Sequence, residues 1–192
     1  YFMPGTAIVY QGEEIGMSNV DYTELSDFRD VEVYTEYHNF IRRGATPETA
    51  MQALRDRARD NARSPFQWDD SPYAGFSTVQ PWMNVVGNYK TIHAKNQMND
   101  HESVYNRYKT VFRLRKELDV SSGDLLFMDI RDENSFVYTN TVATGVLLVV
   151  ANFHNKEVEI QLNIDLSKYE VVLGNCTVQL ERNMTLSPYD AM

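Results

Sequence analysis

Residues 5–12 read GTAIVYQG, a short run rich in β-branched and apolar residues that ends at a Gln-Gly pair. Its apolar residues are continuous rather than alternating, as in strands that are covered on both faces. The stretch therefore predicts a buried strand of a parallel sheet. Glu13 and Glu14 follow directly, and polar groups after a strand form the active sites of (β/α) barrels. The alternative is that the two carboxylates only cap the following turn.

Two helices are expected next along the chain. Residues 34–43 are typical of a short helix that ends at Gly44. Thr46, Pro47 and Glu48 offer a capping hydroxyl, a proline at the first helical position and an early acid. They predict a second helix that runs to about residue 58.

The stretch 60–102 contains no convincing long element, and a loop of that length inside a compact domain is usually functional. Residues 103–118 (SVYNRYKTVFRLRKEL) instead predict an amphipathic helix. Its apolar face is expected to hold Val104, Tyr108, Val111, Phe112 and Leu118, opposite Arg113, Lys116 and Glu117.

After residue 123 the sequence changes to short strand-like runs separated by turn residues. These runs are 125–130, 135–140, 146–152, 158–162, 169–173 and 177–180. Such spacing is typical of a small antiparallel sandwich or barrel. We therefore expect two domains, an α/β part over 1–120 and an all-β part over 121–192.

Composition limits the partners and the compartment. The 192 residues carry a net charge of −9, which argues against nucleic acid or an anionic membrane surface as a partner. No apolar run reaches the roughly 20 residues of a membrane helix. A single cysteine favours a reducing compartment, and we expect a cytoplasmic protein. Because the chain starts without Met inside an apparent element, we interpret it as a fragment of a longer protein.

Two arginines, Arg59 and Arg63, lie four residues apart in ARDNARSPFQWDD, residues 58–70. Arginine binds carboxylates bidentately and also donates to sugar hydroxyls. Asp60 could pair with either arginine, and Phe66 and Trp68 could offer a sugar ring an apolar face. The alternative is a buried ion network between elements, and spacing alone slightly favours it.

Other candidate chemistry is weaker. The charged segment 28–32 (FRDVE) includes Glu32, and such neighbouring charges most often form a solvated surface pair, with a ligand contact as the alternative. The four histidines are scattered without metal-ligand spacing. Neither a phosphate-binding glycine loop nor a nucleophilic triad is visible. We therefore expect no metal and no cofactor.

Together, the motifs and their order resemble the α-amylase-type glycoside hydrolases. The resemblance is strongest to the branch that holds oligo-1,6-glucosidase, dextran glucosidase and trehalose-6-phosphate hydrolase. The matching segments are GTAIVYQGEEIGMSNV, FRDVEV, RARDNARSPFQWDDSPYAGFS, PWMNVVGNYKTI and SVYNRYKTVFRLRKE. This resemblance implies that residues 1–120 form the end of a catalytic (β/α)8 barrel, namely its last strand and the helices that follow. Residues 121–192 would then form the family's C-terminal antiparallel β-sandwich domain.

The resemblance also implies a division of roles. The family's aspartate nucleophile, glutamate acid/base and stabilising aspartate come from earlier barrel strands, so no catalytic residue is expected in this chain. Arg59 matches the first arginine of the RDN(A/S)R motif, which reaches the non-reducing-end glucose in the −1 subsite. Glu32 matches a +1 contact in the D-(V/I)-E motif. Arg63 is expected to be mainly structural, and Glu13 and Glu14 to shape the pocket floor.

The family commonly has threonine and methionine where this chain has Ser64 and Phe66, and both changes are mild. The implied activity is that of a retaining exo-α-glucosidase on short α-1,6-linked glucosides, with α-1,4 linkages as a second class. Its partners would be the oligosaccharide and the remainder of the barrel, and the chain alone would be inactive. Alternatives are a trehalose-6-phosphate hydrolase, a non-catalytic relative that acts as a binding partner, and a separate carbohydrate-binding module over 124–192.

Overall fold

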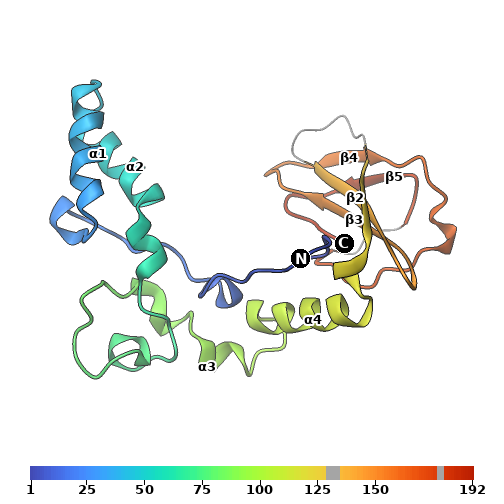
Figure 1. The fold of residues 1–192 in the computed structure, drawn as a ribbon, viewed down its shortest axis with the longest axis horizontal. Helices are drawn as coiled ribbons and strands as arrows, with labels where there is room; N and C mark the ends of the chain where they lie inside the picture. The colour runs from blue at the N-terminus through green and yellow to red at the C-terminus, as the bar shows by residue number, and fades with distance from the viewer. Residues whose placement is uncertain (129–134, 177–179) are drawn as a thin grey trace. The chain divides into compact units, whose positions relative to one another are not determined.

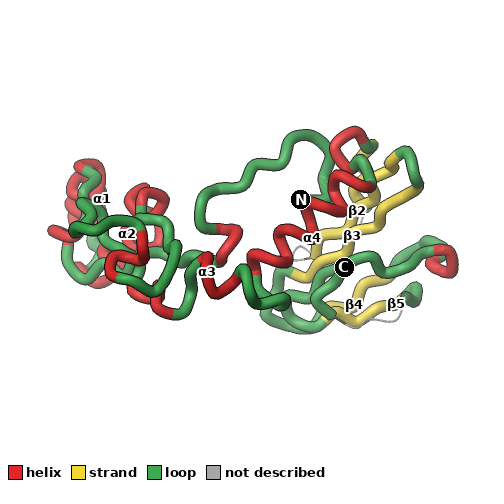
Figure 2. The backbone as a smooth tube through the Cα atoms, turned by 90° about the horizontal axis from the view of Figure 1, so that it is seen from below, coloured by secondary structure: helices red, strands yellow, loops and turns green. Residues whose placement is uncertain are grey.

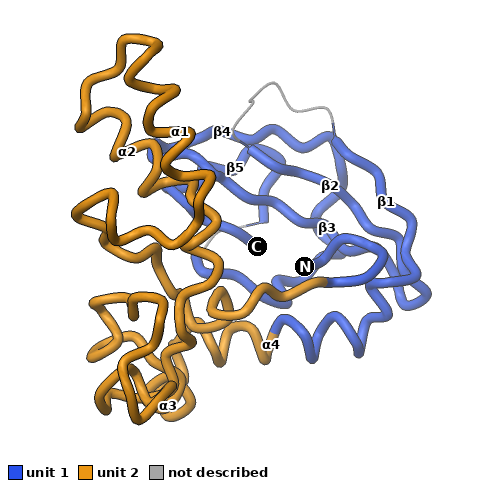
Figure 3. The backbone as a smooth tube through the Cα atoms, turned by 60° about the vertical axis from the view of Figure 1, so that its left-hand side comes forward, with its two compact units in different colours: residues 1–7, 111–192 blue, residues 8–110 orange. Residues whose placement is uncertain are grey.

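The computed structural model describes residues 1–128, 135–176 and 180–192. The chain divides into two compact units, one of residues 8–110 and one of residues 1–7 with 111–192 (Figure 3). The two predicted domains, 1–120 and 121–192, stay a prediction. No helix among the described residues combines the length and the hydrophobicity needed to cross a membrane.

The unit of residues 8–110 is built around two helices, α1 (Val31–Arg42) and α2 (Pro47–Arg57), which pack together (Figure 1). Helix α1 begins three residues before the expected start, because the Asp30 side chain accepts from the Glu32 N–H and caps it. Helix α2 begins as predicted, with the Thr46 hydroxyl accepting from the Thr49 N–H and Pro47 at its first position.

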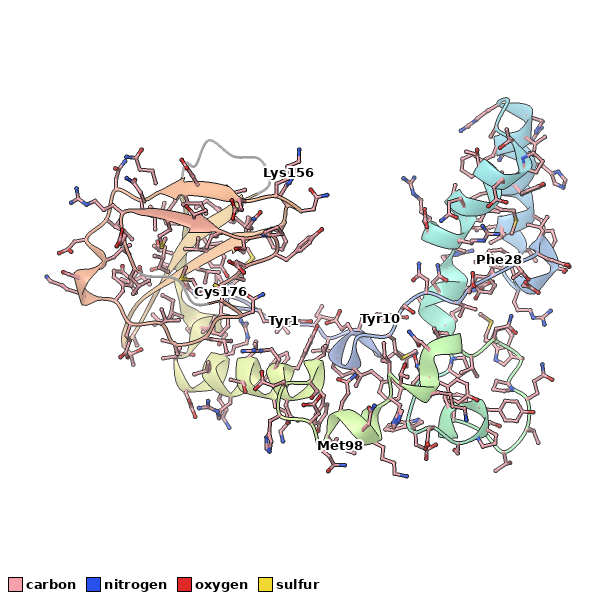
Figure 4. All side chains as sticks on the ribbon, turned by 180° about the vertical axis from the view of Figure 1, so that it is seen from behind. Tyr1, Tyr10, Phe28, Met98, Lys156 and Cys176 are labelled. Atoms are coloured by element: carbon pink, nitrogen blue, oxygen red, sulfur yellow. The ribbon has the colours of Figure 1, made fainter. Side chains whose placement is uncertain are left out.

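Residues 60–102 hold no long element, as predicted, and the unit also contains irregular segments and the start of helix α4 (Val104–Glu117). The short helical elements of this unit are η1 (Glu13–Ile15), η2 (Leu25–Asp27), η3 (Arg59–Arg63), η4 (Pro72–Gly75), η5 (Gly87–Lys90) and the short α-helix α3 (Ala94–Gln97). The core forms where the rings of Tyr22 and Phe28 stack with centroids 4.1 Å apart, against Val33, Met51 and Leu54. Figure 4 shows Phe28 beside the two helices.

The expected buried strand over residues 5–10 is wrong for this structure. The segment has no strand, Ile8 is 80% exposed and Tyr10 is 53% exposed. A parallel strand needs neighbours that accept and donate its backbone hydrogen bonds, and all named strand pairs among the described residues are antiparallel. No closed barrel is present within the described ranges.

The other unit contains two antiparallel sheets (Figure 2). One sheet has the order β1-β2-β3, and the other pairs β4 with β5. The bounds are β1 (Asp124–Phe127), β2 (Ser135–Val142), β3 (Gly145–Asn152), β4 (Val158–Gln161) and β5 (Asn183–Leu186). Val137 and Val150 of the first sheet share one core with Ile160 and Leu186 of the second. This arrangement confirms the expected antiparallel β region.

Some of the individual strand predictions are confirmed and one is wrong. Those over 135–140, 146–152 and 158–162 are confirmed, and β1 covers the described start of the run 125–130. The strand predicted over 169–173 is wrong, because Val171 and Val172 are each 50% exposed in an irregular segment. Residues 129–130 and 177–179 of two predicted strands lie outside the described residues. Strand β5 was not predicted.

Helix α4 (Val104–Glu117) matches the predicted amphipathic helix. Arg113, Lys116 and Glu117 are exposed as expected, but Val104 is 42% exposed rather than covered. Arg115 is buried instead, and its guanidinium donates to the backbone carbonyls of Tyr1, Met3 and Gly5. A buried cation is tolerated here because several carbonyl oxygens replace its water.

Candidate functional site

The motif Arg59–Arg63 forms a single 3₁₀ turn, η3, directly after helix α2. Pro65, two residues after the turn, disfavours its continuation. The turn places Asp60 inside, with its side chain fully buried. The arginine side chains on either side stay partly exposed, 55% for Arg59 and 43% for Arg63.

Asp60 holds the segment that precedes α1. Its Oδ2 accepts from the backbone N–H groups of Arg29 at 2.7 Å and of Asp30 at 3.0 Å. Its Oδ1 lies 3.3 Å from Arg63 Nη1. A buried carboxylate is tolerated where hydrogen bonds and an opposite charge replace its hydration. Asp60 therefore fixes where Asp30 sits.

Asp30, almost fully buried, is the centre of the ion cluster. Its two oxygens accept from Arg59 in a bidentate pair, Nε to Oδ2 at 2.7 Å and Nη2 to Oδ1 at 3.0 Å. Arg63 Nη1 lies 3.4 Å from the same Oδ2. The hydrogen bond from Arg59, followed by that from the Glu32 N–H, lowers the pKa of the Asp30 carboxyl below its ordinary value. Asp30 is thus held ionised.

Glu32 completes the cluster from the first turn of α1. Its Oε2 lies 2.9 Å from Arg59 Nη2, and its side chain is 66% exposed. The hydrogen bond and charge of Asp30, and then the charge of Glu32, raise the pKa of the Arg59 guanidinium. The bidentate geometry fixes the plane of that guanidinium.

Arg59 keeps hydrogen-bonding capacity for a ligand. A guanidinium has five N–H donors, and the contacts above use Nε and Nη2. Its Nη1 has no hydrogen-bond partner among residues 1–128, 135–176 and 180–192. An oriented, half-exposed guanidinium with free donors is suited to bind hydroxyl or anionic oxygens.

A pocket of about 380 Å³ lies beside Arg59, within the unit of residues 8–110. Its lining includes Tyr10, Glu13, Arg57, Arg59 and Asn61. The Tyr10 hydroxyl donates to the carbonyl oxygen of Ala62 at 2.5 Å, so the segment before η1 contacts η3. Figure 4 shows Tyr10 on this segment.

Asn61 lines this pocket with a side-chain amide that the fold holds in place. Its Nδ2 donates to the Arg55 carbonyl at 2.7 Å, which orients the amide. Its Oδ1 is buried and accepts no hydrogen bond from the described part of the chain. A buried unpaired oxygen costs free energy unless a ligand or water supplies a donor. Because this oxygen has almost no accessible surface, a ligand in the pocket does not reach it in this structure.

The structure separates the five residues proposed from the sequence. Arg59 and Glu13 line the pocket, and Glu32 contacts Arg59 directly. Arg63 does not line it and bonds Asp30 and Asp60, as a structural role requires. Glu14 Oε2 accepts from the Gly12 N–H at 2.7 Å, so its carboxylate closes the turn, as the alternative proposed. The ion network weighed as an alternative is present and includes both arginines.

Gly12 permits this turn because its φ of 97° suits only glycine, and an added Cβ would lie 2.7 Å from Met17 Sδ.

The aromatic pair is placed elsewhere. Phe66 and Trp68 contact each other with centroids 4.5 Å apart, and neither lines the Arg59 pocket. They therefore do not provide the sugar platform of that pocket that the sequence suggested.

Sequence reasoning missed Asn61 and the central position of Asp30. Asn61 lies between the two arginines of the motif, so its place inside a charged turn was the available signal. Asp30 lies 29 residues before Arg59, and no local pattern reports a pair of that separation.

We expect acid to weaken this unit through Asp30. Its folded-state pKa is lowered, so its stabilising contribution is present above the unfolded-state pKa, about 3.9, and is lost as the pH falls through the lower folded value. Urea unfolding between pH 6 and pH 3 should show a smaller acid loss for Asp30→Asn than for the parent chain. Asn keeps the helix cap. Equal losses in both chains would contradict this assignment.

Comparisons with known proteins bear on this site. The family described as alpha amylase, catalytic domain, matches residues 1–123. An oligo-1,6-glucosidase of Bacillus cereus is 38% identical over 200 residues, covering 100% of this chain and 36% of that protein. A trehalose-6-phosphate hydrolase of Bacillus subtilis (strain 168) is 37% identical over 198 residues, covering 100% of this chain and 35% of that protein.

A solved structure is similar as well. The crystal structure of Bacillus licheniformis trehalose-6-phosphate hydrolase superposes with a TM-score of 0.89 at 36% identity. The match covers 99% of this chain and 36% of that one. The chain thus spans 35–36% of the length of the two curated relatives.

Proposed function

Because this chain belongs to the α-amylase catalytic-domain family, we propose that it forms the C-terminal part of a retaining exo-α-glucosidase. Its substrates would be short α-1,6-linked glucosides, with α-1,4 linkages as a second class. The observation that carries the proposal is the Arg59 guanidinium, held by Asp30 and Glu32 with Nη1 directed to no described partner. The similarity to an oligo-1,6-glucosidase supports the linkage.

In this proposal Arg59 binds the hydroxyls of the terminal glucose. Charge-assisted hydrogen bonds are roughly twice as strong as neutral ones. Glu13 lines the other part of the pocket. Specificity then follows because a wrong sugar leaves these polar groups unpaired.

The bond-breaking carboxylates are not assigned to this chain. A retaining glycosidase needs two carboxyl groups about 5–5.5 Å apart, one of which donates a proton. Asp30 is unsuited to that role, because its lowered pKa keeps it ionised, and Asp60 is engaged by two backbone N–H groups. The proposal therefore assigns catalysis to the remainder of the barrel, with which this chain would associate.

A single cysteine supports a reducing, cytoplasmic setting.

Trehalose-6-phosphate hydrolase is the second candidate, and one observation favours it. Arg57 lines the same pocket as Arg59, so two guanidinium groups could face a phosphate. The similarity to two proteins of that name is consistent with this reading.

A substrate panel on the whole enzyme separates the two candidates. We expect the highest kcat/KM on isomaltose among isomaltose, maltose, sucrose and trehalose 6-phosphate. A higher value on trehalose 6-phosphate, lost selectively in Arg57→Ala, would establish the second candidate instead. Absence of hydrolysis on the whole panel would contradict both.

A further inference from the structure

A second pocket, of about 320 Å³, lies in the unit of residues 8–110. We call it the Tyr73 pocket, and its lining includes Asp21, Tyr73, Gln80, Pro81, Met83 and Asn84. It shares no lining residue with the Arg59 pocket. Its volume falls at the lower end of the range for small-molecule sites, roughly 300–1,000 Å³.

Tyr73 is held at this pocket by a strained turn. Tyr73 and Ala74 have φ values of 56° and 60°, in the left-handed region that side chains disfavour. The Ala74 carbonyl accepts from the Trp68 N–H at 2.9 Å, and Asp69 Oδ1 accepts from the Ser71 N–H at 2.8 Å. Such strain persists only where the surroundings impose it, and it concentrates at ligand-binding segments.

The lining groups match a neutral sugar. The side chains of Asp21, Gln80 and Asn84 have no hydrogen-bond partner in the described part of the chain, so they can bond hydroxyl groups. Tyr73 adds an aromatic ring with an apolar face. None of the described lining residues is Lys, Arg or His, and Asp21 is acidic. An anionic ligand is therefore disfavoured, whereas a polyhydroxylated ring is suited to the set.

One residue connects this pocket to the Arg59 cluster. The Arg29 N–H donates to Asp60 at 2.7 Å, and its Nε donates to the Trp82 carbonyl at 3.2 Å. Trp82 lies in the chain between Pro81 and Met83, which both line the Tyr73 pocket. Arg29 therefore links Trp82, next to two lining residues of the Tyr73 pocket, to Asp60 of the Arg59 ion cluster.

We propose that the Tyr73 pocket is a second carbohydrate site, which binds a glucosyl unit of the oligosaccharide through Tyr73, Asp21, Gln80 and Asn84. This inference rests on the proposed function for the identity of the sugar. It extends that function, because a second subsite would favour longer glucosides over disaccharides.

The test is a fluorescence titration of the 192-residue chain with isomaltotriose. Trp82 is 69% exposed beside the pocket and serves as the reporter. Tyr73→Gly removes the ring while its left-handed φ suits glycine, so the variant should stay folded. Asn84→Ala removes a polar contact independently, and Tyr34→Ala, at an exposed tyrosine of α1, is the matched control.

We expect saturable binding that Tyr73→Gly and Asn84→Ala each weaken about fivefold or more and that Tyr34→Ala leaves unchanged. Lack of saturable binding, or binding indifferent to both pocket variants, would overturn the inference. Binding lost in Arg59→Ala but kept in Tyr73→Gly would overturn it too, while the proposed function stood.

Discussion

Replacing Arg59 with alanine is expected to lower the kcat/KM of the whole enzyme on isomaltose by at least about 100-fold. The variant loses the guanidinium whose position is fixed by three contacts, two to Asp30 and one to Glu32. It also leaves a buried Asp30 carboxylate with only Arg63 as a cationic partner among the described residues. The decrease in kcat/KM should therefore have two causes, the missing contacts to the sugar and the displacement of the residues around the pocket.

Two further variants separate these causes. Arg59→Lys keeps the charge but cannot form the bidentate pair, so it should recover little activity. Arg42→Ala removes an exposed arginine of α1 that bonds only Asn39 in the described structure, and it should leave kcat/KM unchanged. A decrease in kcat/KM below about threefold for Arg59→Ala would show that Arg59 has only a structural role or no role in substrate binding.

Replacing Asp60 with alanine is expected to lower the free energy of unfolding by about 3–5 kcal/mol. Two backbone N–H groups, those of Arg29 and Asp30, would lose their acceptor in a buried place. Arg63 would also lose one of its two carboxylates. The site should then lose its geometry, because Asp60 positions Asp30 and Asp30 positions Arg59.

Urea unfolding of the chain measures this effect. Asp60→Asn keeps an acceptor oxygen and should cost less than alanine. Asp70→Ala, an exposed acid in the same unit, is the matched control and should change stability by no more than about 0.5 kcal/mol. If Asp60→Ala changes the free energy of unfolding no more than Asp70→Ala does, the role of Asp60 in positioning Asp30 is contradicted.

The elements that the sequence predicted well are those whose causes are local. Helix α2 follows from Thr46 and Pro47 at its start, and strands β2 and β3 follow from runs of β-branched residues joined by a short turn. The segment 5–10 has an equally apolar sequence, but a strand also needs hydrogen-bonding neighbours. The run 169–173 was mispredicted for the same reason.

The candidate site divides in the same way. The arginines of the RDNAR turn, Arg59 and Arg63, were identified as candidates from their own segment. Asp30 and Glu32 reach Arg59 only through the fold, across 29 residues in the case of Asp30. The Tyr73 pocket depends on backbone angles at Tyr73 and Ala74, which no residue type there predicts.

The roles of the two arginines are tested most directly by the kcat/KM of Arg59→Ala and Arg63→Ala enzymes, measured side by side on isomaltose. We assign the sugar contact to Arg59 and a structural role to Arg63, because Arg59 lines the pocket and Arg63 does not. We expect kcat/KM to fall by at least about 100-fold for Arg59→Ala and by no more than about threefold for Arg63→Ala in folded protein. Equal losses, or a larger loss for Arg63→Ala, would contradict these roles of Arg59 and Arg63.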